Sequence, residues 1–327
     1  MKTKYVLSKY MTDSSCTVVT MLFDICLSEE FDNVFTNKRR PIDFYFNQSK
    51  SVLSLQNPMV IFCDNNTVDK LKEMREAAVG TNIPTQYIVK NIVEYDFYKL
   101  HVEQINSIRK THFETYKTQH GVLAWYTLIT MFKYLALFIS KQHNFFNTTH
   151  YAWVDVGCTH IVKSFDEYAP LMLNNPRSKV SVCYIHYRSR YDLYPIEKFL
   201  NNRGPCGIAA GAYTVEASYV DKLYHIGMSV FHEQLFNKYI HSDEQVLTYC
   251  YDKNPEIFNL YYGDYYSIFT NYHKPNNDQQ SIYKYFIQNA LRNNRPDLAV
   301  DAARQILSAD YVDESLKNKL IEIVSQK

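Results

Sequence analysis

Short apolar runs that alternate with helical patterns are the feature that most constrains the fold of this chain. The apolar runs predict buried strands at residues 17–23, 59–63, 86–89, 151–155 and 180–186. The helical patterns predict helices at residues 41–55, 67–79, 96–109, 122–141 and 214–239, with a further helix that begins at Ser242. Such alternation of strands and helices is typical of an α/β layer fold, with a sheet flanked by helices.

The last fifty residues follow a different pattern. They predict three amphipathic helices joined by short turns, at residues 279–291, 295–308 and 314–325. This amounts to about one and a half helical-hairpin repeats, whereas helical solenoids usually need three or more. We therefore divide the chain into a main domain, residues 1–275, and a helical tail, residues 276–327. The tail must dock on the main domain or on another subunit, which would make a homo-oligomer.

Composition and charge exclude several classes of function. Lys plus Arg number 35 against 34 acidic residues, and a net charge of +1 argues against nucleic acid as a partner. The 8 glycines form neither GxGxxG nor GxxxxGK[ST], which excludes Rossmann oxidoreductases and P-loop enzymes. The 7 cysteines form no CxxC pair, and no signal peptide is visible at the N-terminus, so we expect a cytoplasmic protein with reduced thiols.

One stretch resembles a membrane span but carries a charge near its centre. Residues 122–140 are nearly all apolar, and a spanning helix needs about 20 such residues. Lys133 lies within the stretch, and a central Lys costs about 2.5–3.5 kcal/mol on insertion. We expect a buried core helix and no transmembrane segment. Because an unpaired buried charge is expensive, Lys133 should face a carboxylate or an anionic ligand.

The strongest candidate for chemistry is the end of the strand at 151–155. Asp155 follows Trp153 and precedes Gly157, at the carboxyl end of a buried strand, where open α/β sheets bind ligands. Carboxylates there suit Mg²⁺ or Mn²⁺ bound together with a diphosphate, because hard cations prefer oxygen ligands. The structural alternative is an aspartate that caps the following turn.

Two further candidates have equally good structural explanations. Asp243 and Glu244 follow Ser242, and Ser242 with Gln245 also forms a capping box at the start of a helix. Asp264 lies in a Gly-Asp turn between aromatic runs, which turn chemistry explains about as well as function does.

These landmarks, in this order, resemble the HtrL/YibB–WlaTC family. The matching stretches are TVVTMLFDI (17–25), NPMVIFCD (57–64), the helix carrying Lys133, YAWVDVG (151–157), GIAAGAY (207–213), SDEQVL (242–247) and YYGDY (261–265). The resemblance covers about residues 15–275. The family is similar to GT-A glycosyltransferases, which implies a Rossmann-like mixed sheet that binds a nucleotide-sugar.

The resemblance implies roles for individual residues. Asp155 matches the acidic position of a DxD motif, which would hold Mn²⁺ or Mg²⁺ against the nucleotide diphosphate. Gly157 replaces the usual second Asp, and His273 matches a late metal ligand only by its order in the chain. The small-residue loop that contains Ala210 and Gly211 would let the donor sugar approach the backbone.

The implied reaction moves a sugar from a nucleotide-sugar, with a UDP-sugar favoured, to a glycan acceptor. In an inverting transfer, Asp243 or Glu244 would take the proton of the acceptor hydroxyl. The residues expected at the donor and cofactor are Lys133, Trp153, Asp155, Gly157, Ala210, Gly211 and Asp264, with Asp155 and His273 at the metal. Two alternatives remain open: a sugar nucleotidyltransferase, and a non-catalytic carbohydrate-binding or scaffold module.

Overall fold

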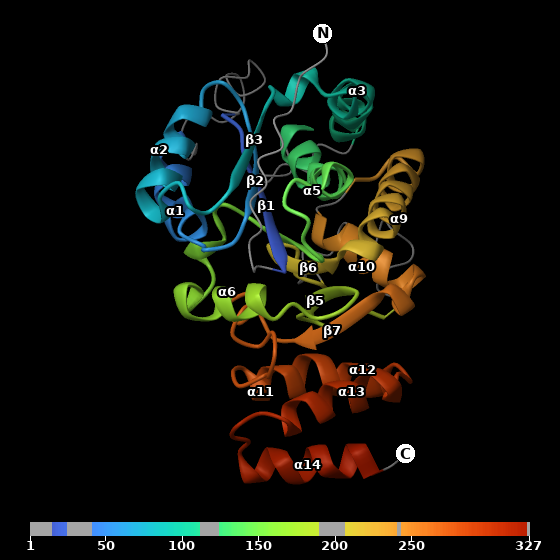
Figure 1. The fold of residues 1–327 in the computed structure, drawn as a ribbon. Coiled ribbons are helices and arrows are strands. Elements are labelled where there is room, and N and C mark those ends of the chain that lie inside the picture. The colour runs from blue at the N-terminus through green and yellow to red at the C-terminus, as the bar shows by residue number, and fades with distance from the viewer. Residues whose placement is uncertain (1–14, 25–40, 112–123, 190–206, 241–242, 326–327) are drawn as a thin grey trace.

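A mixed β-sheet runs through the middle of the molecule (Figure 1). The structure is a computed structural model that describes residues 15–24, 41–111, 124–189, 207–240 and 243–325. In these residues the sheet has seven strands in the order β3-β2-β1-β4-β6-β5-β7. Their bounds are β1 Cys16–Leu22, β2 Met59–Cys63, β3 Thr85–Val89, β4 His150–Val154, β5 Val180–Tyr184, β6 Ala212–Glu216 and β7 Phe258–Tyr262.

The strand directions bring the carboxyl ends of most strands, and the start of β6, to one edge of the sheet. Strands β1 to β4 pair in parallel, and β5 pairs in parallel with β7. Strand β6 is antiparallel to both of its neighbours, β4 and β5, so it begins at the edge where they end. The chain proceeds from β1 to β2 and β3 on one side and then crosses to β4 on the other side of β1. This reversal between β1 and β4 is a topological switch point, where open α/β sheets bind ligands.

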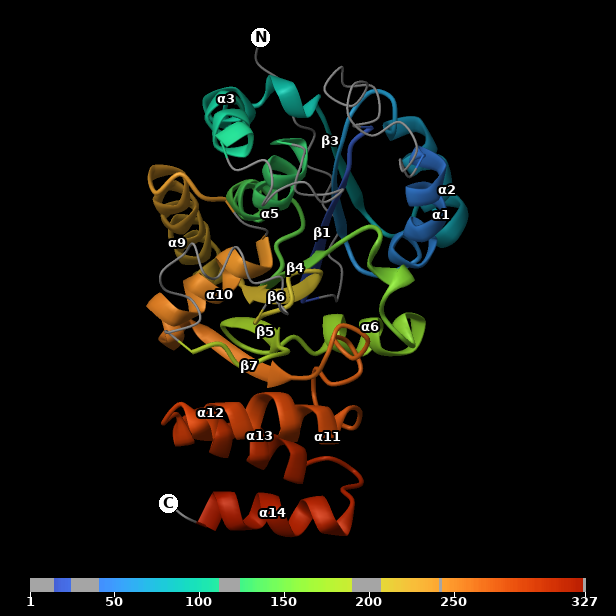
Figure 2. The ribbon, with the colours of Figure 1, turned by 180° about the vertical axis from the view of Figure 1, so that it is seen from behind.

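Helices cover both faces of the sheet (Figure 2). One face carries α1 Ile42–Leu53, α2 Val68–Val79 and α6 Phe165–Asn174. The other carries α3 Asp96–Thr111, α5 Ala124–His143, α9 Ala217–Phe236 and α10 Asp243–Lys253. Because both faces are covered, strands such as β1 are buried along their whole length and read as continuous apolar runs. The predicted fold class, an α/β mixed sheet flanked by helices, is confirmed.

Helix α5 is the apolar stretch that resembled a membrane span. It packs against the sheet, α3 and α9, and most of its side chains are buried. Within the described residues, no helix combines the length and the apolar character needed to cross a bilayer. The expected core helix is therefore present, with Lys133 near its middle.

Three elements differ from the sequence predictions. The predicted helix 214–239 is a strand followed by a helix, because residues 212–216 pair with β4 before α9 begins at Ala217. The β-branched pair Thr214 and Val215 favours this extended form. For β7 the sequence predicts only aromatic runs around a turn, and it predicts no helix at α6.

The short turns of helix are η3 Ile92–Glu94, η4 Cys158–His160 and η5 Pro255–Ile257.

The tail docks on the main domain along β7 (Figure 1). This is the first of the two predicted alternatives, the other being another subunit. Its helices are α11 Gln279–Ser281, the π-helix η6 Ile282–Ile287, α12 Gln288–Arg292, α13 Pro296–Leu307 and α14 Glu314–Ser325. The Phe286 ring lies 4.9 Å from the ring of Tyr184 and 4.6 Å from that of Tyr262, measured between centroids. The Tyr262 hydroxyl donates to Asp301 Oδ2 at 2.7 Å. The domain boundary and a homo-oligomer through the tail stay predictions.

Docking of the tail should depend on Phe286. We expect Phe286→Ala to lower the free energy of unfolding by about 3–5 kcal/mol, because it removes a fully buried ring from a packed aromatic cluster. The matched control, Leu291→Ala, changes a side chain that is 37% exposed and should cost about 1 kcal/mol or less. Urea unfolding followed by circular dichroism measures both, and equal losses would contradict this account of the interface.

Candidate functional site

The end of strand β4 places Asp155 at the switch point between β1 and β4. The backbone N–H of Asp155 donates to the carbonyl of Gly211 at 2.8 Å, which ties the strand end to the segment that leads into β6. The indole Nε1 of Trp153 donates to Asp155 Oδ1 at 2.8 Å. Trp153 itself is fully buried, so any effect of Trp153 on a ligand would pass through Asp155, and its role at the donor stays a prediction. The carboxylate side chain is 37% exposed and can be reached from solvent.

Lys133 of α5 joins Asp155 to Asp243. Its Nζ lies 3.0 Å from Asp155 Oδ1 and donates to Asp243 Oδ2 and, at 3.2 Å, to the carbonyl of Ala210. The Lys133 side chain is 5% exposed, and its Nζ lies 5.5 Å from the centroid of the Trp153 ring. The expectation that Lys133 faces a carboxylate is confirmed, and it faces two.

The two carboxylates keep Lys133 charged. Burial alone lowers the pKa of the Lys133 ammonium, but Asp155 and Asp243 outweigh burial and raise it above its ordinary range. The ammonium is therefore present at every pH at which enzymes ordinarily work. Burial raises the pKa of the Asp155 carboxyl, against the lowering effect of the Lys133 charge.

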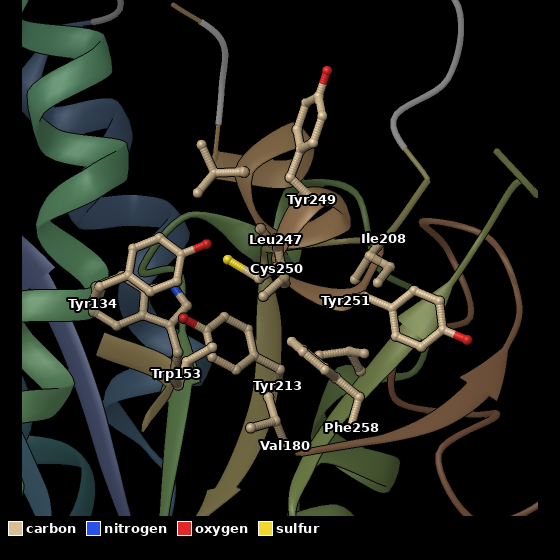
Figure 3. Close-up of a cluster of buried hydrophobic side chains, with 14 of the residues drawn as sticks. Tyr134, Trp153, Val180, Ile208, Tyr213, Leu247, Tyr249, Cys250, Tyr251 and Phe258 are labelled. Atoms are coloured by element: carbon tan, nitrogen blue, oxygen red, sulfur yellow. The ribbon is translucent and has the colours of Figure 1, made fainter. Parts of the chain in front are cut away.

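Trp153, which lies beside Lys133, belongs to a large cluster of buried apolar and aromatic side chains. Figure 3 shows Trp153 from β4 and Tyr213 from β6 in the same cluster as Tyr134 from α5 and Cys250 from α10. All four are buried. A surrounding of this kind has a low effective dielectric, which strengthens the attraction between Lys133 and its partners.

Asp243 and Glu244 lie in the first turn of α10 and differ in their surroundings. The Asp243 side chain is 7% exposed and pairs with Lys133, whereas Glu244 is half-buried. Asp243 is thus the residue of the pair that the structure brings to Asp155. Ser242, the other half of the expected capping box with Gln245, lies outside the described residues.

Tyr126 is a further candidate, which the sequence analysis missed. Burial and, next, the negative charge of Asp243 raise the pKa of the Tyr126 phenol, and the side chain is 36% exposed. It precedes Lys133 by seven residues, which places both on one face of α5. That spacing from Lys133, the one charged residue in the apolar stretch 122–140, is the signal that could have found it.

Two glycines leave the backbone accessible beside Asp155. A Cβ at Gly211 would lie 3.6 Å from Asp155 Oδ2, and a Cβ at Gly157 would lie 3.9 Å from Cδ1 of Tyr45. Among the described residues neither position is crowded, and both glycines are partly exposed. Ala210 is buried and contributes its carbonyl to Lys133.

Asp264 and His273 have other surroundings. Asp264 follows β7, and β5 and β6 lie between that strand and β4. Its Oδ1 accepts from the backbone N–H groups of Tyr266, at 2.8 Å, and Ser267, at 2.9 Å, as turn chemistry predicts. His273 is exposed, with Nε2 3.3 Å from the carbonyl oxygen of Leu171. Their roles at the donor and the metal stay predictions.

The carboxylates of this site fit a divalent metal only if a diphosphate supplies further ligands. Among the residues that the structure describes, no group of three His, Cys, Asp or Glu could hold a metal ion. Mg²⁺ is commonly bound by one or two carboxylates plus the phosphates of a substrate, and Mn²⁺ suits the same oxygen ligands. Asp155, partly exposed and beside two open glycines, can supply one such carboxylate.

Comparison with known proteins gives one family and a set of distant structures. A family model described as "Bacterial protein of unknown function (HtrL_YibB)" matches residues 14–274. A search of curated proteins returned no match.

Similar solved structures include three glycosyltransferases. Mouse xyloside xylosyltransferase 1, in its apo form, is 9% identical with a TM-score of 0.38, and the match covers 74% of this chain and 83% of that one. Core-mannan synthase A from Aspergillus fumigatus, in a Mn/GDP form, is 10% identical with a TM-score of 0.43, covering 77% and 74%. A glycosyltransferase involved in glycosylation of the major capsid of PBCV-1 is 11% identical with a TM-score of 0.33, covering 76% and 81%. Likeness at this level does not identify an activity.

Removing Lys133 should destabilise the protein through the carboxylates it leaves behind. We expect Lys133→Met to lower the free energy of unfolding by about 3–5 kcal/mol, because Asp243 would remain buried without its cation. Adding Asp243→Asn to that variant should restore much of the loss by removing the stranded charge. Denaturant unfolding of the single and double variants measures this, and additive losses would show that the ion pair does not control stability.

Proposed function

We propose that this chain, which belongs to the HtrL_YibB family of bacterial proteins of unknown function, is a glycosyltransferase that moves a sugar from a nucleotide-sugar to a glycan acceptor. The observation that carries the proposal is the buried Lys133 that holds Asp155 and Asp243 together at the switch point of the sheet. A buried charge cluster of this kind costs solvation energy, and such clusters gather at functional sites.

The donor diphosphate would bind at Asp155, where the backbone at Gly157 and Gly211 is open. With both carboxylates ionised, one ammonium would leave the group net negative, and the group would repel the negative charges of a nucleotide diphosphate that binds without a metal. A divalent cation, Mn²⁺ or Mg²⁺, that arrives with the diphosphate would reverse this repulsion. When bound, the metal would stabilise the negative charge of the departing diphosphate. We favour a UDP-sugar as the donor.

The acceptor would bind on the side of α10. In an inverting transfer the acceptor oxygen attacks the anomeric carbon, the bond from that carbon to the diphosphate breaks, and a carboxylate takes the hydroxyl proton. Asp243 is our candidate for this base, because its ion pair with Lys133 orients the carboxylate toward the same ammonium that Asp155 contacts. Glu244, half-buried in the same turn, is the second candidate. Tyr126, partly exposed on the same face of α5 as Lys133, would line this side and offer an aromatic surface to a sugar.

The Lys133 ion pairs argue against one of the two alternative functions, and a binding experiment tests the other. A sugar nucleotidyltransferase that uses two carboxylates and two metals needs both carboxylates as ligands, whereas Lys133 occupies the space between Asp155 and Asp243. A non-catalytic carbohydrate-binding or scaffold module would need no nucleotide site. Calorimetry with a panel of UDP- and GDP-sugars distinguishes the module, which would bind none of them.

Metal and nucleotide should bind together. We expect Mn²⁺ to tighten UDP binding by at least about tenfold, roughly 1.4 kcal/mol, and to bind poorly by itself, because Asp155 is a single protein ligand. Asp155→Asn should abolish the gain, while Asp166→Asn, an exposed acidic residue of α6, should retain it. Isothermal titration calorimetry of UDP with and without Mn²⁺ measures this. Equal UDP affinity in both conditions would rule out a metal bridge to the diphosphate.

Asp155 and Asp243 should affect different steps. Asp155→Asn should weaken donor affinity and turnover together, because it acts on the bound diphosphate in the ground state. Asp243→Asn should lower turnover by about 10²–10⁴-fold, the range of general-base catalysis, while donor affinity changes little. Initial-rate kinetics with donor-binding measurements test both, with Glu244→Gln alongside. If only Glu244→Gln lowers turnover, the base is Glu244.

A further inference from the structure

The segment 207–211 connects to each part of the candidate site. The carbonyl of Gly207 accepts from the backbone N–H of Ile185 at 2.8 Å, and the N–H of Ala209 donates to the carbonyl of Cys183 at 2.9 Å. These bonds fix the segment on the end of β5. Its last two carbonyls serve the site, as described above: that of Ala210 accepts from Lys133 and that of Gly211 from the Asp155 backbone.

Thr248 ties the same segment to α10. It is 1% exposed, and its hydroxyl donates to the carbonyl of Glu244 at 2.8 Å while accepting from the backbone N–H of Ile208 at 3.0 Å. The contact is tight: a Cβ at Gly207 would lie 2.6 Å from Thr248 Oγ1, and Gly207 has a φ of +51° that favours glycine. The Thr248 side chain thus fills the space that a side chain at position 207 would need.

These bonds close a ring that joins α5, the segment 207–211 and α10. Starting from Lys133, the ring passes through the carbonyl of Ala210 and along the backbone to the N–H of Ile208, which donates to the Thr248 hydroxyl. The hydroxyl donates to the carbonyl of Glu244, and the neighbouring Asp243 pairs with Lys133, which closes the ring. The first turn of α10 is therefore held from two directions, by the Lys133 ion pair and by the Thr248 hydroxyl.

The hydroxyl is poorly explained by packing alone. A valine has nearly the same shape, and a threonine hydroxyl that bonds back to the carbonyl four residues earlier slightly destabilises a helix. What a valine lacks is the acceptor for the buried N–H of Ile208, the bond that crosses between α10 and the segment.

We infer that Thr248 is a positioning residue that sets the place of Asp243 relative to segment 207–211 and to the donor bound there. This inference rests on the proposed transferase function. It assigns to Thr248 no contact with the reacting atoms; it acts through Asp243.

The first test compares Thr248→Val with Thr248→Ser. We expect the valine variant to lower kcat by at least about tenfold, roughly 1.4 kcal/mol of barrier, with the donor KM within about twofold. The serine variant keeps the hydroxyl and should retain kcat within about threefold. A valine variant that loses thermal stability but keeps kcat would show that the hydroxyl is only structural and would overturn the inference.

The second test asks whether Thr248 acts through Asp243. In an Asp243→Asn background, Thr248→Val should lower kcat by no more than about twofold further, because there is no carboxylate left to position. Independent, multiplicative losses would contradict the inference.

A third measurement separates this inference from the proposed function. Hydrogen exchange should quicken at the amide of Ile208 and in the first turn of α10 when Thr248 becomes valine, and unchanged exchange would overturn the inference by itself. If the wild-type chain transfers sugar from no donor, the proposed function fails, whereas the exchange result still decides whether Thr248 holds the segment to α10.

Discussion

A buried ammonium that must be neutralised is the interaction on which the rest of this structure depends. Lys133 projects from the buried, largely apolar middle of helix α5, and removing a cation from water costs several kcal/mol even after relaxation. Two carboxylates and a carbonyl offset that cost, and they come from β4, from α10 and from the segment before β6. The partners lie 22, 110 and 77 residues along the chain from Lys133. One charge therefore fixes the mutual positions of α5 and three elements around it.

The antiparallel strand β6 makes this convergence possible. Had the chain entered β6 in the direction of its neighbours, segment 207–211 would lie at the opposite edge of the sheet from Asp155. Because β6 runs the other way, its beginning meets the end of β4, and the carbonyls of Ala210 and Gly211 come beside Lys133 and Asp155. The register of β4 with β6, Val154 opposite Ala212, sets this meeting to within one residue.

The helical tail lies far from Asp155 but covers the last strand of the same sheet. Strand β7 is the last strand, and an uncovered edge strand presents unpaired backbone groups that invite aggregation. The side chain of Gln305 donates to the carbonyl of Leu260 at 2.9 Å, and Phe286 extends the core beyond β7. The tail thus completes the core of the main domain, which agrees with the inference that its helices are too few to fold as a solenoid.

The sequence by itself determined the elements with strong local periodicity, such as the strand at 59–63 and the tail helix at 314–325, and it predicted that Lys133 would need an anion. It also placed Asp155 at a strand end. It did not separate β6 from α9, because the apolar run there suits either form and only pairing with β4 selects the strand. Nor could it say that Asp243, rather than Glu244, reaches Lys133, or that the Thr248 hydroxyl meets Ile208. Local spacing records the period of an element, whereas these contacts depend on strand register and helix rotation, which are fixed only when distant segments pack.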